Sequence, residues 1–154
     1  MKQSKIAVAL VVALAFVFAA AGLYAATAPA VIKMQTAGYA KHTKPIVAFS
    51  HKKHTTPAYG AKCGDCHHDK AGKPLAALKD GDPVQKCSVC HKSLSLAAPA
   101  VLKGLAGPVR KKKELEFHAN AIHLNCIDCH KTWNKKNAKK PNEGAPVACN
   151  KCHK

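Results

Sequence analysis

The strongest hydrophobic pattern lies at the amino end of the chain. A short basic start, MKQSK, precedes an apolar block that is dense from Ile6 to Ala21, and small residues follow at Ala25 and Ala26. A basic start, an apolar block and a small-residue cleavage point are typical of an export signal. We therefore expect residues 1–25 to be a signal peptide and residues 26–154 to form the mature domain. Because the apolar block is long, an uncleaved membrane anchor stays open as the alternative.

The rest of the chain has little apolar patterning. Two short apolar runs, Val31–Met34 and Ile46–Phe49, are separated by a polar connection with turn residues, which predicts a two-stranded hairpin. Farther on, apolar positions at helical spacing predict a helix from about Lys111 to Leu124. The segment Ala97–Lys113 contains prolines and glycines and ends in a basic run, which is typical of an exposed loop. We expect short helices and loops elsewhere.

The composition indicates that something other than side chains fills the interior. The expected mature domain has few aromatic residues and no long apolar strand, whereas the whole chain has 25 Lys and Arg against 8 Asp and Glu. A small domain needs a core, or staples such as disulfides or metals, to offset chain entropy. The eight cysteines are the candidates for that role.

All eight cysteines fall into four identical Cys-x-x-Cys-His motifs. On a helical turn the two cysteines lie on one side, where both can form thioethers to haem vinyl groups, and the histidine sits under the iron as an axial ligand. Zinc sites and disulfides also fit the cysteine count, but neither gives the four histidines a role. The sequence therefore predicts four covalent haem c groups. The motifs are Cys63, Cys66 and His67; Cys87, Cys90 and His91; Cys126, Cys129 and His130; and Cys149, Cys152 and His153.

Each haem iron has a second axial position, and histidine is its main candidate ligand. Met34 is the single methionine after residue 25, whereas six histidines lie outside the motifs. Methionine raises the potential of a haem relative to histidine. We therefore expect low-potential, bis-histidine haems without an open position for substrate, and hence an electron carrier rather than an enzyme. The six histidines are His42, His51, His54, His68, His118 and His123.

The motifs VIKMQT, IVAFSHKKH and CGDCHH, with three further Cys-x-x-Cys-His sites, resemble the class III cytochromes c, the tetrahaem cytochrome c3 family of sulfate-reducing bacteria. The resemblance covers most of the chain from about Val31. It implies a mostly irregular fold with small helices and a short two-stranded hairpin, wrapped around four haems. It also implies distal ligands: His51 for the first haem, His68 for the second and His54 for the third.

For the fourth haem, the resemblance places the distal histidine between the second and third motifs, where both His118 and His123 lie. These two are five residues apart, or roughly 140° around a helix, so both cannot easily serve one iron. We favour His123, because it stands close before a haem site in the manner of the family. Many family members have four residues between the cysteines of the second and fourth motifs, whereas every motif here has two.

The three remaining candidates have plainer interpretations. His42 lies in a polar segment with turn character and is expected at the surface. Met34 is expected to pack in its strand, and Trp133 to pack on a porphyrin or line the surface.

The resemblance implies a periplasmic carrier between a hydrogenase or formate dehydrogenase and a membrane-bound cytochrome complex of sulfate respiration. The alternative is a terminal reductase of metal ions or another small acceptor. Because the mature chain stays basic, we expect acidic redox proteins as partners. We expect a monomer and no nucleic acid, with membrane contact only if residues 1–25 stay attached. The lysines near the third and fourth sites are Lys111, Lys112, Lys113, Lys131, Lys135, Lys136, Lys139, Lys140, Lys151 and Lys154.

Overall fold

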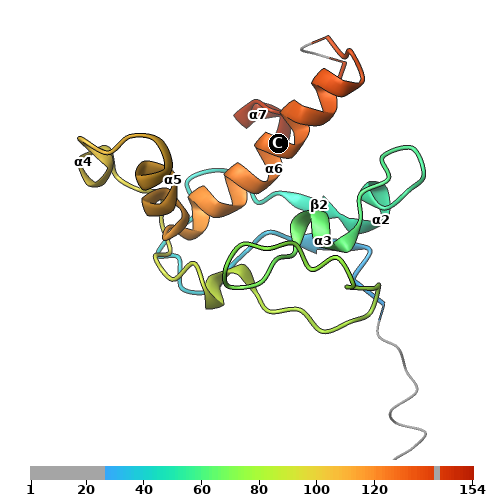
Figure 1. The fold of residues 1–154 in the computed structure, drawn as a ribbon, viewed down its shortest axis with the longest axis horizontal. Helices are drawn as coiled ribbons and strands as arrows, with labels where there is room; N and C mark the ends of the chain where they lie inside the picture. The colour runs from blue at the N-terminus through green and yellow to red at the C-terminus, as the bar shows by residue number, and fades with distance from the viewer. Residues whose placement is uncertain (1–26, 141–142) are drawn as a thin grey trace, which may run out of the picture.

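A computed structural model describes residues 27–140 and 143–154 (Figure 1). The expected signal peptide, residues 1–25, lies outside the described residues. The longest element is helix α6, His118–Lys136, which runs diagonally through the view in Figure 1. A small sheet lies to one side of it, and two short helices project at its amino end.

The sheet is an antiparallel pair formed by β1, Val31–Lys33, and β2, Ala48–Ser50. Ile32 lies opposite Phe49, and one further hydrogen bond, from Met34 N to Val47 O at 2.9 Å, continues the pairing. The predicted hairpin is therefore confirmed, with its second strand starting two residues later than expected.

Single helical turns make up most of the other regular structure. They are α2, His51–His54; α3, Cys63–Cys66; the 3₁₀ turn η1, Cys87–Val89; α4, Pro99–Leu102; and α7, Cys149–Cys152. The expected fold class, mostly irregular chain with short helices and one two-stranded sheet, is confirmed.

The predicted continuous helix from Lys111 to Leu124 is wrong. Helix α5, Gly107–Leu115, ends before Phe117, whose backbone is extended at φ −94° and ψ 121°, and α6 then starts at His118. The chain at Ser93 causes the break, because its N–H donates to Glu116 O at 3.2 Å and its carbonyl accepts from His118 N at 2.9 Å. These bonds to a distant segment replace helical ones. Helix α6 also continues far beyond the expected end, through the third motif.

The expectation of an exposed loop at Ala97–Lys113 is also wrong, because this segment contains α4 and most of α5. Pro99 and Pro108 each stand in the first turn of their helix. A proline lacks an N–H, which the first turn does not need, and its fixed φ suits a helix start. The two prolines therefore begin helices here rather than interrupt them.

Very little of the described chain is buried. Leu102 and Ala121 are the buried apolar residues, at 6% and 7% exposure, and His118 is the buried polar one at 3%. No large side chain of the described residues is completely buried. In residues 27–140 and 143–154, no helix combines the length and apolarity needed to cross a bilayer. The polypeptide alone therefore lacks the core that a domain of this size needs.

Candidate functional site

Each of the four motifs forms a turn of helix. The backbone N–H of the motif histidine donates to the carbonyl of the first cysteine in three of them: His67 to Cys63 at 2.9 Å, His91 to Cys87 at 2.9 Å, and His153 to Cys149 at 2.8 Å. The third motif lies inside α6, so that it is helical as well. These turns place both cysteines of a motif on one side with the histidine after them, as attachment of a haem requires.

Close packing in the first motif depends on Gly64, which is buried in α3. A Cβ atom at this position would lie 2.7 Å from the carbonyl oxygen of Leu75 and 2.8 Å from its carbonyl carbon. Both atoms are backbone and cannot move aside cheaply. The loop after the first motif therefore folds back tightly onto the turn that carries Cys63 and Cys66.

The cysteines do not have the character of a redox dithiol. No disulfide joins any two of the eight, all of which lie in the described residues. Burial raises the pKa of the Cys126 thiol to about 11, and burial also raises the pKa values of Cys66, Cys87 and Cys152. Thiol–disulfide exchange needs a thiolate, which a low pKa provides and these surroundings oppose. The arrangement favours anchoring over exchange.

Backbone carbonyls fix the orientation of six histidines. In each case ring Nδ1 donates to a carbonyl, which leaves Nε2 with a free lone pair for a metal. Three of the acceptors belong to prolines that lie outside any helix or strand. The pairs are His51 to Pro29 at 2.8 Å, His54 to Ser50 at 2.8 Å, His68 to Asp69 at 2.7 Å, His130 to Pro146 at 2.6 Å, His153 to Pro45 at 2.7 Å, and His91 to Leu115.

Three pairs of histidine rings lie at one common separation. The ring centres are 6.1 Å apart for His54 and His130, 6.0 Å for His68 and His91, and 6.1 Å for His123 and His153. Metal–imidazole bonds are about 2 Å long, so two imidazoles on opposite sides of one iron have ring centres roughly 6 Å apart. The side chains present therefore fit a metal ion between each pair, although they come from segments far apart in the sequence.

The remaining motif histidine, His67, lies near His51. Burial lowers the pKa of the His67 imidazole, and the neighbouring His51 and His68 rings lower it further. A lowered pKa keeps the ring neutral, which is the form that binds a metal. Phe49 lies against both histidines of α2, with ring centres 4.9 Å from His51 and 4.6 Å from His54.

The structure places His118 and His123 in different surroundings. His123 is exposed on α6 and faces His153. His118 is buried, and its Nδ1 shares a 2.8 Å hydrogen bond with the hydroxyl of Tyr39. Burial lowers the pKa of His118, with a smaller contribution from nearby His91. Of the two, His123 is the one brought to a motif histidine at the 6 Å separation.

His42, Met34 and Trp133 lie at the surface or in packing contacts, as expected from the sequence. His42 is exposed and stacks on Tyr39, with ring centres 5.5 Å apart. Met34 is half-buried beside the sheet. Trp133 packs against Tyr59, with ring centres 5.6 Å apart.

Sequence reasoning missed several residues that hold the site together. Asn125 donates from its side chain to Cys66 O at 3.2 Å, which ties the third motif to the first. The carbonyls of Pro29, Pro45 and Pro146 accept from His51, His153 and His130, respectively. The hydroxyl of Tyr39 shares a hydrogen bond with His118. No sequence signal marks such acceptors, because any residue has a carbonyl and only the backbone path decides where it points.

Comparison with known proteins gives the class of this site. The model of the class III cytochrome c family matches residues 27–153. The chain belongs to the class III cytochrome c family. It is 30% identical over 134 residues to a cytochrome c3 of Desulfovibrio desulfuricans, covering 82% of this chain and 95% of that one. It is also 28% identical over 152 residues to a cytochrome c3 of Nitratidesulfovibrio vulgaris, strain Hildenborough, covering 93% of each.

Family membership decides between the alternatives that the sequence left open. The four motifs carry four covalent haem c groups, rather than zinc ions or disulfides. The protein is a multihaem electron carrier and not an enzyme, so the terminal-reductase alternative is set aside. The same haems account for the scarcity of buried side chains, because their porphyrins would supply apolar surface that the polypeptide lacks.

Proposed function

We propose that the protein is a low-potential electron carrier whose four haem irons are each held by two histidines. The pairs are His51 with His67, His68 with His91, His54 with His130, and His123 with His153. The observation that carries this proposal is the common separation of about 6 Å between the rings of three pairs. The nearness of His51 to His67 supports the fourth pair.

The protein's own groups then have defined tasks. The cysteines Cys63, Cys66, Cys87, Cys90, Cys126, Cys129, Cys149 and Cys152 hold the porphyrins covalently. The backbone carbonyls orient the rings and make them better donors to the metal, because an Nδ1–H bonded to an acceptor raises ligand basicity. When bound, the haems supply one-electron redox chemistry at low potential.

We place the protein in the periplasm, with residues 1–25 removed as a signal peptide. The basic start, apolar block and small residues of the amino end support this location. By likeness to the family, its partners would be acidic redox proteins such as a hydrogenase or formate dehydrogenase, and a membrane-bound cytochrome complex of sulfate respiration.

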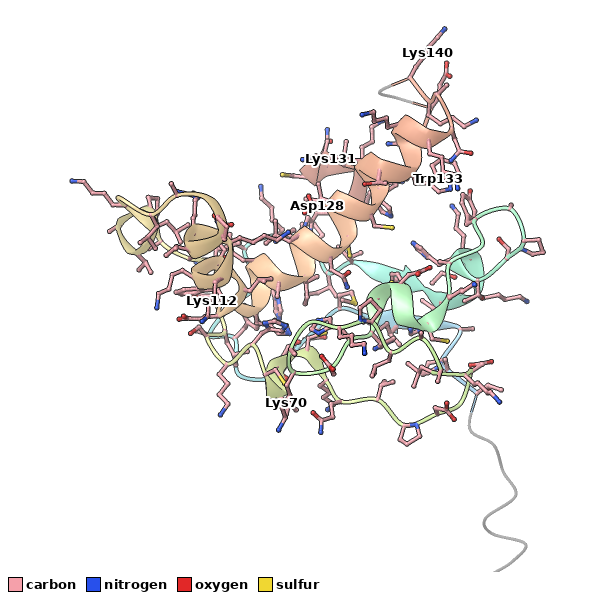
Figure 2. The ribbon with its side chains drawn as sticks, in the orientation of Figure 1. Lys70, Lys112, Asp128, Lys131, Trp133 and Lys140 are labelled. Atoms are coloured by element: carbon pink, nitrogen blue, oxygen red, sulfur yellow. The ribbon has the colours of Figure 1, made fainter. Side chains whose placement is uncertain are left out.

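The charge distribution supports acidic partners. Exposed lysines follow the later part of α6 and reach α7, around the third and fourth motifs. Figure 2 shows Lys131 and Lys140 along this side, whereas Lys70 lies on the opposite side of the molecule. Such a concentration of lysines beside two haem motifs steers an acidic partner toward them and speeds association at low salt.

Reduction by a periplasmic hydrogenase under hydrogen gas tests this part of the proposal. We expect the second-order rate to fall steeply as salt rises, because screening weakens the attraction. Neutralising Lys131 and Lys151 together, as K131Q/K151Q, is expected to lower the rate at low salt about tenfold. The matched variant K70Q/K79Q removes the same charge elsewhere and is expected to change it less than twofold. A salt-independent rate, or equal losses in both variants, would contradict the proposed docking side.

A further inference from the structure

The segment around α4 and α5 is unusual in this lysine-rich chain. From Ser93 to Val109 the single charged residue is Lys103, and a run of four cations follows immediately at Arg110–Lys113. We call residues 97–115, which contain α4 and α5, the α4–α5 arm. It lies at one extreme of the molecule in Figure 1.

The α4–α5 arm exposes much of its apolar surface. Val101 is 40% exposed and Val109 is 62% exposed, while Leu96, just before the arm, is 59% exposed. Leu102 is the one apolar side chain of the arm that is buried. Single exposed apolar residues are common, so what distinguishes these three is their position on or beside one projecting element that also carries a run of cations.

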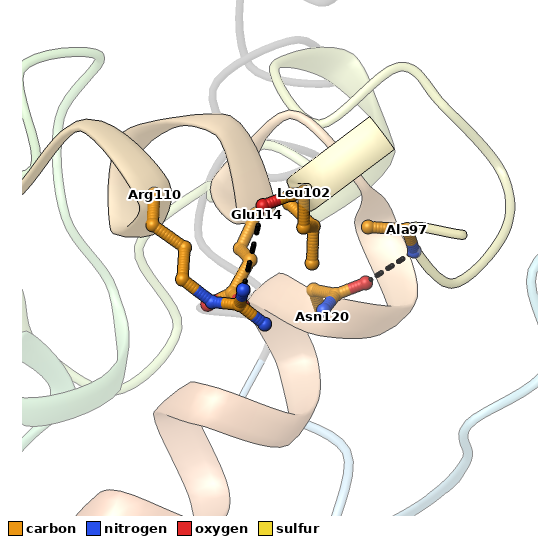
Figure 3. Close-up of polar contacts among 5 residues, drawn as sticks. All are labelled: Ala97, Leu102, Arg110, Glu114 and Asn120. Atoms are coloured by element: carbon orange, nitrogen blue, oxygen red, sulfur yellow. Dashed lines mark hydrogen bonds and ion pairs between the residues drawn. The ribbon is translucent and has the colours of Figure 1, made fainter. Parts of the chain in front are cut away.

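Hydrogen bonds join the α4–α5 arm to α6 and join its two helices to each other. Ala97 N donates to Asn120 Oδ1 of α6 at 2.7 Å, and Arg110 Nε donates to Glu114 Oε1 at 3.0 Å (Figure 3). Arg110 also reaches the carbonyl of Leu102 at 3.5 Å, which joins α5 to α4. The exposed side chains are therefore presented on a fixed scaffold.

Two lysines of the α4–α5 arm, Lys111 and Lys112, are exposed and take no part in the ion pairs of the described residues. Glu114 of the arm is paired with Arg110, and Glu116, just after the arm, is paired with Lys113. Val109 and Lys112 are three residues apart on α5, so an apolar and a cationic side chain share one face.

The end of the α4–α5 arm lies behind the histidine of the second motif. Nδ1 of His91 donates to Leu115 O at the end of α5, whereas the His91 ring faces His68 across a 6.0 Å gap. The two ring nitrogens point in nearly opposite directions, so Leu115, the last residue of the α4–α5 arm, lies on the far side of the His91 ring from the Nε2 that would hold the second haem. This one step rests on the proposed pairing of His68 with His91.

We propose that the α4–α5 arm is a docking surface for an anionic phospholipid membrane. A lipid headgroup layer presents phosphates above hydrocarbon, which matches lysines beside exposed aliphatic side chains on one element. An acidic protein surface would be complementary in charge to the lysines, but it would place carboxylates against the apolar side chains of Leu96, Val101 and Val109. We expected membrane contact only through residues 1–25; the α4–α5 arm provides a second, reversible contact that survives their removal.

Vesicle flotation with the mature, haem-loaded protein tests this proposal. With vesicles of phosphatidylglycerol and phosphatidylcholine in equal parts, we expect binding that weakens with salt, and with pure phosphatidylcholine almost none. The variant K111Q/K112Q is expected to bind the anionic vesicles about 30-fold more weakly. The matched variant K139Q/K140Q removes the same charge at the other end of α6 and is expected to lose less than threefold.

A second pair of variants separates the apolar contribution from the charge. V109S is expected to weaken binding about fivefold, because serine buries less apolar surface at the hydrocarbon boundary than valine does. The control variant V84S changes a side chain that is 46% exposed elsewhere in the chain, and it is expected to have no effect. Absence of binding to anionic vesicles, or equal losses in K111Q/K112Q and K139Q/K140Q, would overturn the proposal. Slower exchange of K111Q/K112Q with an acidic redox protein, without any vesicle binding, would assign the surface to a protein instead. The haem spectrum of each variant is read alongside, so failure here is distinct from failure of the ligand assignment.

Discussion

The chain made without haem attachment is expected to be unfolded. Among the described residues only Leu102 and Ala121 are buried apolar side chains, which is far too little burial to offset the chain entropy of a domain of this size. Covalent haems supply the missing apolar surface and join segments that are distant in sequence. We therefore expect almost complete loss of cooperative unfolding in the haem-free chain, and not a modest shift of its midpoint.

Circular dichroism during heating measures this effect, with the haem-loaded protein in the same buffer as control. The haem-free chain is expected to have little helical signal at the start and no sigmoidal transition. Retention of a helix as long as α6 with a cooperative transition would mean that the polypeptide has a core of its own, against the burial described above.

The second large effect is expected at His123. Replacing it with alanine removes one of the two proposed ligands of the fourth iron, so about one quarter of the ferric haem should become high-spin while the rest stays low-spin. The reason is the position of His123, whose ring centre lies 6.1 Å from that of His153. Electron paramagnetic resonance of the oxidised variant measures the fraction, and added imidazole should restore the low-spin form.

His118→Ala is the matched control for this experiment. It removes the buried hydrogen bond to Tyr39 and is expected to destabilise the protein by about 1–3 kcal/mol, yet to leave all four haems low-spin. A high-spin signal in His118→Ala together with an unchanged spectrum in His123→Ala would reverse the assignment of the fourth distal ligand.

The features that could be predicted from the sequence are local or repeat a known pattern. Cysteines three apart with a histidine next need only one helical turn, and the structure forms such a turn at Cys63, Cys87 and Cys149. The hairpin followed from two short apolar runs on either side of a turn. The distal histidines came from the family resemblance, and their pairing stays a proposal.

The features that sequence reasoning missed depend on contacts between distant segments. The backbone hydrogen bonds of Ser93 break the helix between α5 and α6, and the pattern of residues around Phe117 does not predict these bonds. The bond from His153 to Pro45 joins residues 108 positions apart. The sequence predicts a loop at the α4–α5 arm because a proline that begins a helix cannot be told from one that ends it by composition alone. In the structure Pro99 and Pro108 stand in first helical turns, and Arg110 joins α5 to the carbonyl of Leu102 in α4.

The central claim is that every iron in the protein has two histidine ligands. Electron paramagnetic resonance of the fully oxidised, haem-loaded wild-type protein, integrated against iron content, tests it most directly. The proposed pairs predict four low-spin ferric haems per chain and no high-spin signal. A stable high-spin signal from one quarter of the iron or more would contradict them, because at least one iron would then have an open or weakly bound position.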